Sequence, residues 1–163
     1  MTAEIELPCG KAVPIDREDL WLVQQHRWYA ASHNTHTWYA VAGTGLPDGR
    51  RAWVYMHRLI LGLTDPSVLV DHISGDGLDN RRVNLRTCSR SENARNSRKR
   101  VNNTSGFKGV SWQKGRGKWK AQISVAGKNR HLGLFNTAAE AHSAYCRAAD
   151  ELHGEFRNYG DTA

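Results

Sequence analysis

Asp71 and His72 stand side by side after a short apolar run, and together they offer a carboxylate and an imidazole. Phosphodiester cleavage with one metal ion needs a cation on the phosphate and leaving group, and a base that activates water. A carboxylate is a hard oxygen ligand that suits magnesium or manganese. A histidine with an ordinary pKa of about 6.5 is largely neutral at cellular pH and can accept a proton. On a strand, Asp71 would face metal and His72 would face the attacking water.

Two asparagines further along the chain could complete such a site. Asn93 falls on the first turn of a helix predicted by the capping-box pattern Ser89-x-x-Glu92, and its amide oxygen can be a second metal ligand. Asn84 stands at the entry to an expected strand, where its side chain can brace the loop and orient His72. Asn84 could also be a purely structural strand-entry residue, and Asn93 a solvent-facing helix residue.

The elements that position these residues are a strand, a loop, a second strand and a helix. The apolar run 68–70 predicts the first strand, 74–80 is a loop rich in Gly and Asp, 83–87 predicts the second strand, and the helix is expected to end near 100. Asp76 and Asp79 do not have EF-hand spacing, so we assign them to turn formation. His57 is expected to be packed or to contact phosphate rather than to bind metal.

The stretch that contains these residues resembles a known protein family. The stretches DHISGDGLDNRRVNL and RSENARN resemble the core of His-Asn-His homing endonucleases of phage and intron origin, whose shared fold is the ββα-metal finger. The resemblance covers about residues 50–100 and includes the lead-in VYMHRLILG. It implies that Asp71–His72 is the family's Asp-His pair, Asn84 its central Asn and Asn93 its helical ligand. Many members have His at the last position and add zinc-binding cysteines; both are missing here, which favours the Asn-ligand branch.

The charge of the chain is concentrated in its middle. The 163 residues carry a formal charge of +7, and residues 81–131 contain 15 Lys or Arg against one acid, Glu92. Such a block indicates a polyanion partner, chiefly nucleic acid, although a solvated basic face is the alternative. Arg90 and Arg95, on the expected helix, are candidates to follow the DNA backbone.

The C-terminal third resembles a second family. Residues 109–113, 119–125 and 130–135 read as three strands split by Gly-containing turns, and Thr137-x-x-Glu140 starts a helix. The landmarks FKGV, KW, LG and the closing NY resemble the Apetala-type domain of plant ethylene-response factors, which implies a sheet that lies in the major groove. By position, that family's DNA-facing side chains fall on Lys108, Ser111, Gln113, Lys120, Gln122, Ser124, Arg130 and His131.

Some residues of this region depart from the family or have competing roles. Ser111, Gln113 and Ser124 replace family arginines, which puts the plant base preference in doubt. The basic turn should still grip phosphates through Lys114, Arg116 and Lys118. We expect Trp119 to be core, whereas for Trp112 stacking or groove contact is slightly favoured.

The expected fold is α+β: a ββα-metal (His-Me finger) nuclease core with N-terminal β-strands, then a three-stranded antiparallel sheet packed on one helix. We expect an N-terminal β-rich segment over 1–49, the nuclease core over 50–100, a linker over 101–106 and the DNA-binding domain over 107–163. Cys9, Cys88 and Cys146 form no CxxC pair, so neither a disulfide framework nor a cysteine zinc site is predicted. No apolar run approaches the ~18 residues of a membrane span.

These features predict an intracellular, metal-dependent endonuclease that nicks or cuts double-stranded DNA with Mg²⁺ or Mn²⁺. The resemblance implies a mobile, phage-encoded homing endonuclease that acts in the cytoplasm of a bacterial host. The alternative is a DNA-binding transcriptional regulator with an inactive nuclease core, and an RNA-binding protein is a third possibility. The sequence does not decide between a monomer and a homodimer, or between a nick and a double-strand break.

Overall fold

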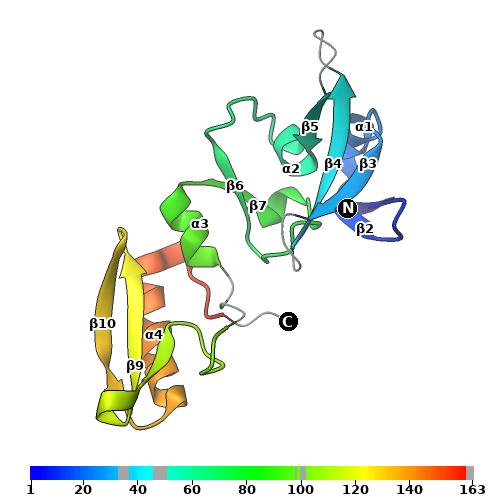
Figure 1. Ribbon diagram of the computed structural model, residues 1–163. Helices are drawn as coiled ribbons and strands as arrows, with labels where there is room; N and C mark the ends of the chain where they lie inside the picture. The colour runs from blue at the N-terminus through cyan, green and yellow to red at the C-terminus, as the bar shows by residue number, and fades with distance from the viewer. Residues whose placement is uncertain (33–36, 46–50, 98, 100–101, 161–163) are drawn as a thin grey trace. The chain divides into compact units, whose positions relative to one another are not determined.

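The computed structural model describes residues 1–32, 37–45, 51–97, 99 and 102–160 (Figure 1). The chain divides into two compact units, Met1–Cys88 and Ser89–Ala163. Both units combine short helices with small antiparallel sheets, so the fold is a mixture of helix and strand, as expected. Within the described residues, no helix is long and apolar enough to cross a membrane.

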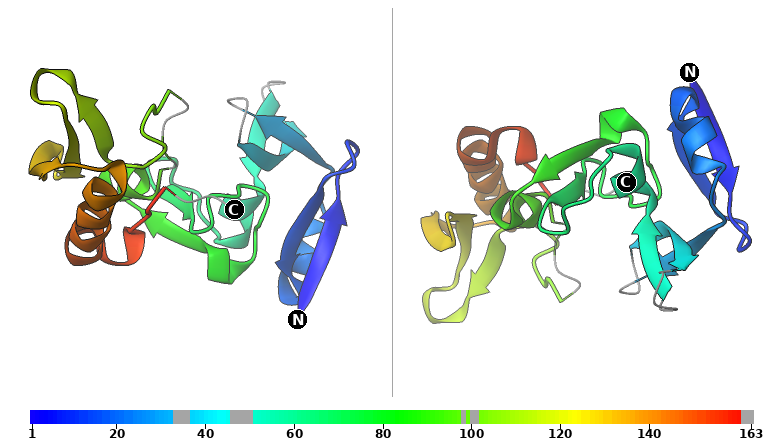
Figure 2. Two further views of the ribbon diagram at one scale, coloured as in Figure 1. Left: turned by 90° about the horizontal axis from the view of Figure 1, so that it is seen from below. Right: turned by 90° about the horizontal axis from the view of Figure 1, so that it is seen from above.

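The first unit is built from three small antiparallel sheets. Strands β1 (Thr2–Glu6) and β2 (Ala12–Asp16) form a hairpin near the N-terminus (Figure 2). Strands β3 (Trp28–Ser32), β4 (Trp38–Gly45) and β5 (Arg51–Tyr55) form a sheet in that order, and β6 (Leu69–His72) pairs with β7 (Leu85–Cys88). The short helices α1 (Leu20–Val23) and α2 (Met56–Ile60) lie between them in the chain. The predicted 28–42 hairpin is present as β3–β4, and its expected turn near Asn34 lies outside the described residues.

The second strand of the predicted nuclease motif begins later than expected. A 3-10 turn over Arg82–Asn84 precedes β7, which starts at Leu85. Asn84 ends this turn: its backbone N–H donates to the Arg81 carbonyl oxygen at 2.8 Å, and its side chain forms hydrogen bonds with the preceding loop. The Asn84 N–H is therefore not available for pairing with β6, and β7 begins one residue later, at Leu85.

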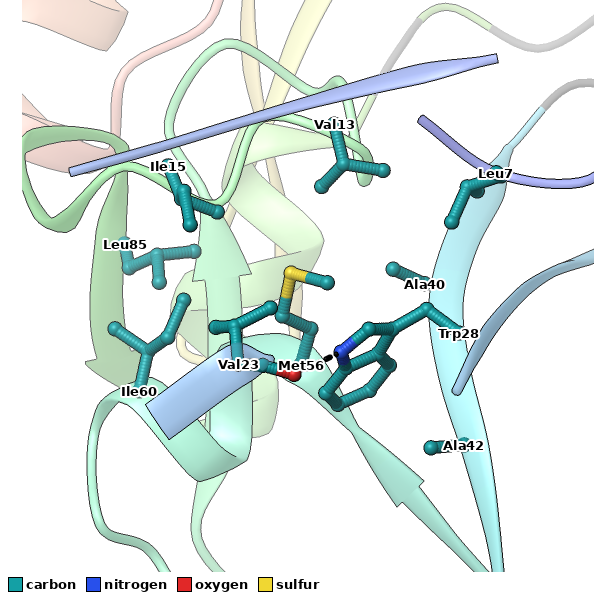
Figure 3. Packing of buried hydrophobic residues seen from close by; sticks show 10 residues of the cluster. All are labelled: Leu7, Val13, Ile15, Val23, Trp28, Ala40, Ala42, Met56, Ile60 and Leu85. Atoms are coloured by element: carbon teal, nitrogen blue, oxygen red, sulfur yellow. Dashed lines mark hydrogen bonds between the residues drawn. The ribbon is translucent and has the colours of Figure 1, made fainter. Parts of the chain in front are cut away.

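One apolar core joins the N-terminal strands to the hairpin β6–β7. Leu85, the first residue of β7, is buried in the same cluster as Val13 and Ile15 of β2 (Figure 3). Trp28 closes one side of the cluster, and its indole N–H donates to the Val23 carbonyl oxygen at 2.8 Å. Burial of such side chains contributes ~1.5–3 kcal/mol each before the entropy of ordering them is counted. The full cluster contains Leu7, Val13, Ile15, Val23, Trp28, Ala40, Ala42, Met56, Ile60 and Leu85.

Polar contacts also tie the N-terminal segment to the loop before β7. The Arg82 guanidinium donates to both carboxylate oxygens of Asp19, at 2.6 and 2.9 Å, and to the Ile60 carbonyl oxygen at 2.9 Å. The Asn80 N–H donates to the Pro14 carbonyl oxygen at 2.9 Å. These contacts give the N-terminal strands a structural role: they support the segment that carries Asn84.

The second unit is a three-stranded sheet with a helix on one face. Strands β8 (Val110–Gln113), β9 (Lys118–Val125) and β10 (Lys128–Phe135) are antiparallel in the order β10-β9-β8, and α4 (Ala138–His153) packs against them (Figures 1 and 2). Small alanines on α4 let the helix lie close to the sheet, as the sequence predicts. The buried residues between them are Val110, Ala121, Ile123, Ala141, Tyr145, Ala148 and Ala149.

Helix α3 (Arg90–Asn96) opens this second unit. Both predicted capping boxes are present: Ser89 with Glu92 at α3, and Thr137 with Glu140 at α4. Helix α3 ends at Asn96 rather than near residue 100, because the backbone at Ser97 is extended. By compactness α3 groups with the C-terminal residues, whereas the sequence predicts it in the nuclease core over 50–100. The predicted domain boundaries stay a prediction.

Candidate functional site

Asp71 and His72 are the last two residues of β6, and both are buried. The antiparallel register places Asp71 opposite Arg86 and His72 opposite Leu85 on β7. Because successive residues of a strand face opposite sides, the carboxylate and the imidazole leave the hairpin in different directions. The hairpin therefore presents the two groups on opposite faces, and the expected roles of Asp71 at a metal and His72 at the attacking water stay predictions.

The Asp71 carboxylate is paired with Arg86 across the hairpin. The Arg86 Nε and Nη2 atoms both donate to Oδ2 of Asp71, at 2.9 and 2.7 Å, and both side chains are largely buried. A pair of this kind fixes the carboxylate and offsets the cost of burying its charge. Arg86 was not singled out from the sequence, although the register of a β6–β7 hairpin, once known, is enough to find it.

Asn84 braces the loop between the two strands. Its Oδ1 accepts a hydrogen bond from the Ser74 N–H at 2.8 Å, and its Nδ2 donates to the Asp79 carbonyl oxygen at 2.8 Å. The Ile73 N–H donates to the Asn84 carbonyl oxygen at 2.9 Å. One buried amide thus holds both ends of the loop that follows His72.

The two loop aspartates form turns, as expected. Asp76 Oδ1 accepts from the Leu78 N–H at 3.0 Å. Asp79 accepts from the Arg81 guanidinium at 2.6 and 2.8 Å, and this hydrogen bonding lowers the pKa of Asp79. Both carboxylates are therefore used within the loop.

The imidazole of His72 lies in an aromatic cluster that the sequence did not reveal. The His57 ring from α2 is perpendicular to it, with centroids 5.1 Å apart, and the Tyr39 ring from β4 is 5.8 Å away. Tyr55 contacts His57 at 5.4 Å. Gly77 lets the loop approach Tyr39, since a Cβ there would lie 2.7 Å from its Cε1 atom and 2.5 Å from the Trp38 carbonyl oxygen. His57 is packed, which agrees with the expectation from sequence.

Burial controls the charge of both histidines. Burial lowers the pKa of His57 to about 3, helped by the nearby His72 and Arg58. Burial also lowers the pKa of His72, and the Asn80 side chain and the Asp71, Asp76 and Asp79 carboxylates oppose that shift in part. His72 is therefore neutral near pH 7 and has the protonation state of a proton acceptor.

The two metal ligands expected from the sequence are oxygen donors, which suit a hard divalent cation. Within the described residues, no group of three or more His, Cys, Asp or Glu could hold a metal ion. Asp71 and Asn93 offer a carboxylate and an amide oxygen, and magnesium is commonly held by one or two carboxylates while waters and substrate phosphates complete its shell. Asn93 is exposed on α3, where an amide oxygen is accessible. Asp71 belongs to the first unit and Asn93 to the second.

Comparison with known proteins identifies the family. Residues 35–95 match the family model for HNH endonucleases, and this range contains Asp71, His72, Asn84 and Asn93. The chain is 36% identical over 90 residues to Protein 3.8 of Escherichia phage T7, across 55% of this chain and 74% of that protein. The chain belongs to the family of that phage protein and contains an HNH endonuclease-like domain. No solved structure is significantly similar to it.

Outside the HNH match, the sheet of the C-terminal unit has an open face. The register pairs Gln113 with Lys118, Ser111 with Lys120, and His131 with Gln122. The intervening residues of β9, Ala121 and Ile123, are buried beneath α4, so these pairs lie on the opposite face. Gln113, Lys118, Lys120 and Gln122, which we proposed to bind DNA, therefore share one surface.

Arg130 does not share that surface. It pairs with Ile123, so it lies on the helix-side face of edge strand β10, where it is exposed. A β-bulge between His131 and Gly133 shifts the register by one residue, which the sequence pattern did not indicate. Trp119 is core, as expected, and Trp112 packs against it with centroids 5.0 Å apart while its ring stays half exposed.

The remaining basic candidates fall into two groups. Lys114 and Arg116 are exposed in the 3-10 turn before β9, as a phosphate-gripping turn requires. Lys108 instead turns toward α3, where its ammonium group donates to the carbonyl oxygens of Arg95 and Ser97 at 2.6 Å each. Burial lowers the pKa of Lys108 to about 8. Arg90 is exposed and Arg95 half-buried on α3.

Proposed function

We propose that this chain is a metal-dependent HNH endonuclease that hydrolyses phosphodiester bonds of double-stranded DNA. The observation that carries the proposal is the buried, neutral His72, which directly follows Asp71 at the end of β6 within the HNH match. Neither a buried imidazole nor a buried carboxylate is a favourable packing residue, so their retention together supports a chemical role.

In this proposal, His72 is the general base. Its neutral imidazole accepts a proton from the attacking water, and the rings of His57 and Tyr39 fix its orientation. Asn84 holds the loop after His72 in one conformation, so that the imidazole stays in place when substrate binds.

Asp71 and Asn93 are the residues that would hold Mg²⁺ or Mn²⁺. Such an ion, when bound, supplies positive charge next to the scissile phosphate and the leaving oxygen. Arg86 fixes the Asp71 carboxylate through Oδ2, so the orientation of the carboxylate does not depend on a bound ion. By the resemblance stated above, β6 and β7 would be the two strands of a ββα-metal finger and α3 would be its helix.

We propose that the C-terminal unit holds the DNA as an Apetala-like domain, with its open sheet face in the major groove. The support is the surface formed by Gln113, Lys118, Lys120 and Gln122, together with the basic turn. Lys120→Ala should weaken binding of duplex DNA, and Lys128→Ala, a charge-matched change at the exposed end of β10, should weaken it less. Equal effects of the two changes in a mobility-shift titration would argue against the sheet face.

The phage relative supports a biological setting. We propose a phage-encoded homing endonuclease that acts on DNA inside a bacterial host. One such site breaks one strand at a time, so a double-strand break requires a second copy of the chain or a second event. A DNA-binding regulator with an inactive core is the competing function, and the open sheet face alone would satisfy it.

A plasmid-nicking assay separates these functions. The wild-type chain should convert supercoiled plasmid to the open circle with magnesium or manganese and not with chelator. His72→Ala should abolish nicking while duplex DNA binding stays near the wild-type level. His26→Ala is the matched control. His26 belongs to the same unit, packs on Trp28, and is far in the sequence from the hairpin β6–β7. Nicking that persists in His72→Ala, or that ignores chelator, would overturn the mechanism, and binding without any nicking would favour the regulator.

A further inference from the structure

Helix α3 carries Asn93 and is too short to be stable through its own hydrogen bonds. It has 7 residues, whereas isolated helices shorter than ~12–15 residues are only marginally stable in water. Its N-terminal end is closed locally, by the capping box of Ser89 and Glu92. The place of the helix therefore depends on what holds its other end.

Residues outside the helix hold the C-terminal end of α3. A helix leaves its last four carbonyl oxygens without partners in the helix itself. Here the Asn158 Nδ2 atom donates to the carbonyl oxygen of Asn96 at 3.0 Å and to its Oδ1 atom at 3.2 Å. The Lys108 ammonium group donates to the carbonyl oxygens of Arg95 and Ser97 at 2.6 Å each. Lys108 precedes the sheet and Asn158 follows α4, so α3 is fastened to both ends of the sheet-and-helix fold.

Asn158 is itself held in one place, beside α3 (Figure 1). Its Oδ1 atom accepts a hydrogen bond from the Gly160 N–H at 2.7 Å, and its carbonyl oxygen accepts one from the hydroxyl of the buried Tyr145 of α4 at 3.2 Å. Gly160 lies against Lys108, since a Cβ there would be 2.6 Å from the Lys108 Cβ. Asn96 is 5% exposed, so its contact with Asn158 is shielded from water. The contact is therefore a fixed anchor between α4 and α3.

Asn93 lies about one helical turn before the anchored end. Its N–H donates to the Ser89 carbonyl oxygen at 3.0 Å, and its side chain is exposed. A helix turns once in ~3.6 residues, so a rotation at Asn96 is carried directly to Asn93. The direction of the Asn93 amide is therefore set by the contacts of Asn96 with Asn158.

We propose that Asn158 is a positioning residue of the nuclease: it anchors the C-terminal end of α3 and thereby orients the Asn93 amide toward the metal ion. This inference rests on the proposed function, in which Asn93 is a metal ligand. Asn158 does not touch the ion or the DNA in this role. The C-terminal unit then has two tasks, because it holds the DNA with its sheet and holds a ligand helix with the segment after α4.

Three substitutions in the full chain separate anchoring from general damage. Asn158→Ala removes both donations to Asn96. Asn158→Asp keeps the size of the side chain and the acceptor for the Gly160 N–H but cannot donate, so it repeats the test if the alanine variant fails to fold. Tyr159→Phe is the control, because the neighbouring hydroxyl bonds to Asp150 and Arg157 instead of α3.

Two measurements are made, and neither requires nicking. Hydrogen exchange at the α3 amides is followed in the metal-free chain. The dissociation constant of Mn²⁺ is measured by electron paramagnetic resonance with duplex DNA present, in a His72→Ala background that should leave the DNA uncut. The second measurement is repeated with Asn93→Ala, alone and combined with Asn158→Ala. Affinity for duplex DNA without metal is determined for each variant.

Both Asn158 variants should exchange the α3 amides about tenfold faster than the wild type, because the hydrogen bonds to Asn96 are lost, and Tyr159→Phe should change them less than about twofold. Asn158→Ala should weaken Mn²⁺ binding about tenfold, as expected for a residue that orients a metal ligand. In the Asn93→Ala background it should have no further effect, since Asn158 acts through Asn93. Affinity for DNA without metal should change less than about twofold.

The proposal is overturned if the Asn158 variants exchange α3 no faster than Tyr159→Phe, or if Mn²⁺ binding is unchanged. It is also overturned if Asn158→Ala weakens Mn²⁺ binding by the same factor with and without Asn93, or if DNA affinity falls as much as Mn²⁺ affinity. An unchanged Mn²⁺ affinity in Asn93→Ala alone would overturn the metal assignment of the proposed function, while the exchange result would still decide whether Asn158 anchors α3. The two proposals therefore fail separately.

Discussion

Replacement of Asn84 by alanine tests how the loop after His72 is held. The change removes the acceptor for the Ser74 N–H and the donor to the Asp79 carbonyl oxygen, both at 2.8 Å. The Ser74 N–H is partly exposed and can bind water instead, so loss of its hydrogen bond to Asn84 costs ~1 kcal/mol. The hydrogen bond to the Asp79 carbonyl oxygen is buried, so its loss leaves that oxygen unsatisfied at a cost of ~1–3 kcal/mol. We therefore expect a loss of about 2–4 kcal/mol in the free energy of unfolding, most of it from the Asp79 side.

Two measurements check this value. Urea unfolding gives the global loss for the first unit, and hydrogen exchange at the Ser74 amide reports the local opening of the loop. Val83→Ala is the control, because Val83 is the neighbouring residue and its side chain is 77% exposed. It should change stability by less than about 0.5 kcal/mol. If Asn84→Ala costs no more than the control, or if exchange at Ser74 is unchanged, the side chain of Asn84 does not brace this loop.

Further substitutions test the surroundings of the candidate site. Arg86→Ala removes the cation that pairs with the buried Asp71 and should lower the free energy of unfolding in urea by ~3 kcal/mol or more. Added manganese should restore part of this stability. A loss below ~1 kcal/mol would contradict the buried pair. Gly77→Ala places a Cβ against the Tyr39 ring, so it should lower the free energy of unfolding by ~1–3 kcal/mol and reduce nicking. Gly45→Ala is the control, because a Cβ there meets nothing within 4 Å, and its stability should be nearly unchanged. Equal thermal stability of the two variants would refute the close approach of Gly77 to Tyr39.

Local sequence patterns predicted the parts of the fold that short-range chemistry decides. The capping box at Ser89 and Glu92 requires only four consecutive residues, and the structure contains it. The placement of Asp71 and His72 at a strand end follows from an apolar run that stops at a polar pair. The three strands and the closing helix of the C-terminal unit follow from turn residues and from alanines at helical spacing.

Contacts that depend on register or on distant elements could not be predicted in this way. The pairing of Arg86 with Asp71 needs the alignment of β6 and β7, and the loop between those strands does not fix that alignment by its sequence. Tyr39 reaches His72 from a strand more than 30 residues away in the chain, through the gap left by Gly77. The β-bulge after His131 turned Arg130 away from the face on which an unbroken alternation would be expected to place it.

Lys108 shows the same limit for charged side chains. From the sequence it is one more base in a cationic stretch, and we assigned it to DNA. In the structure the Lys108 ammonium group caps the C-terminal end of α3: it donates to the carbonyl oxygens of Arg95, in the helix, and of Ser97, directly after it. Cations favour helix C-termini, but the sequence does not show that residue 108 returns to a helix that ends at residue 96.

The most direct test of the proposed catalytic site is a crystal structure of the chain with manganese and duplex DNA, in which anomalous scattering locates the ion. We expect an ion bound by the Asp71 carboxylate and the Asn93 amide oxygen, with the His72 imidazole beside the phosphate that the ion contacts. Manganese located elsewhere, with Asp71 and Asn93 far apart and no phosphate near His72, would contradict it.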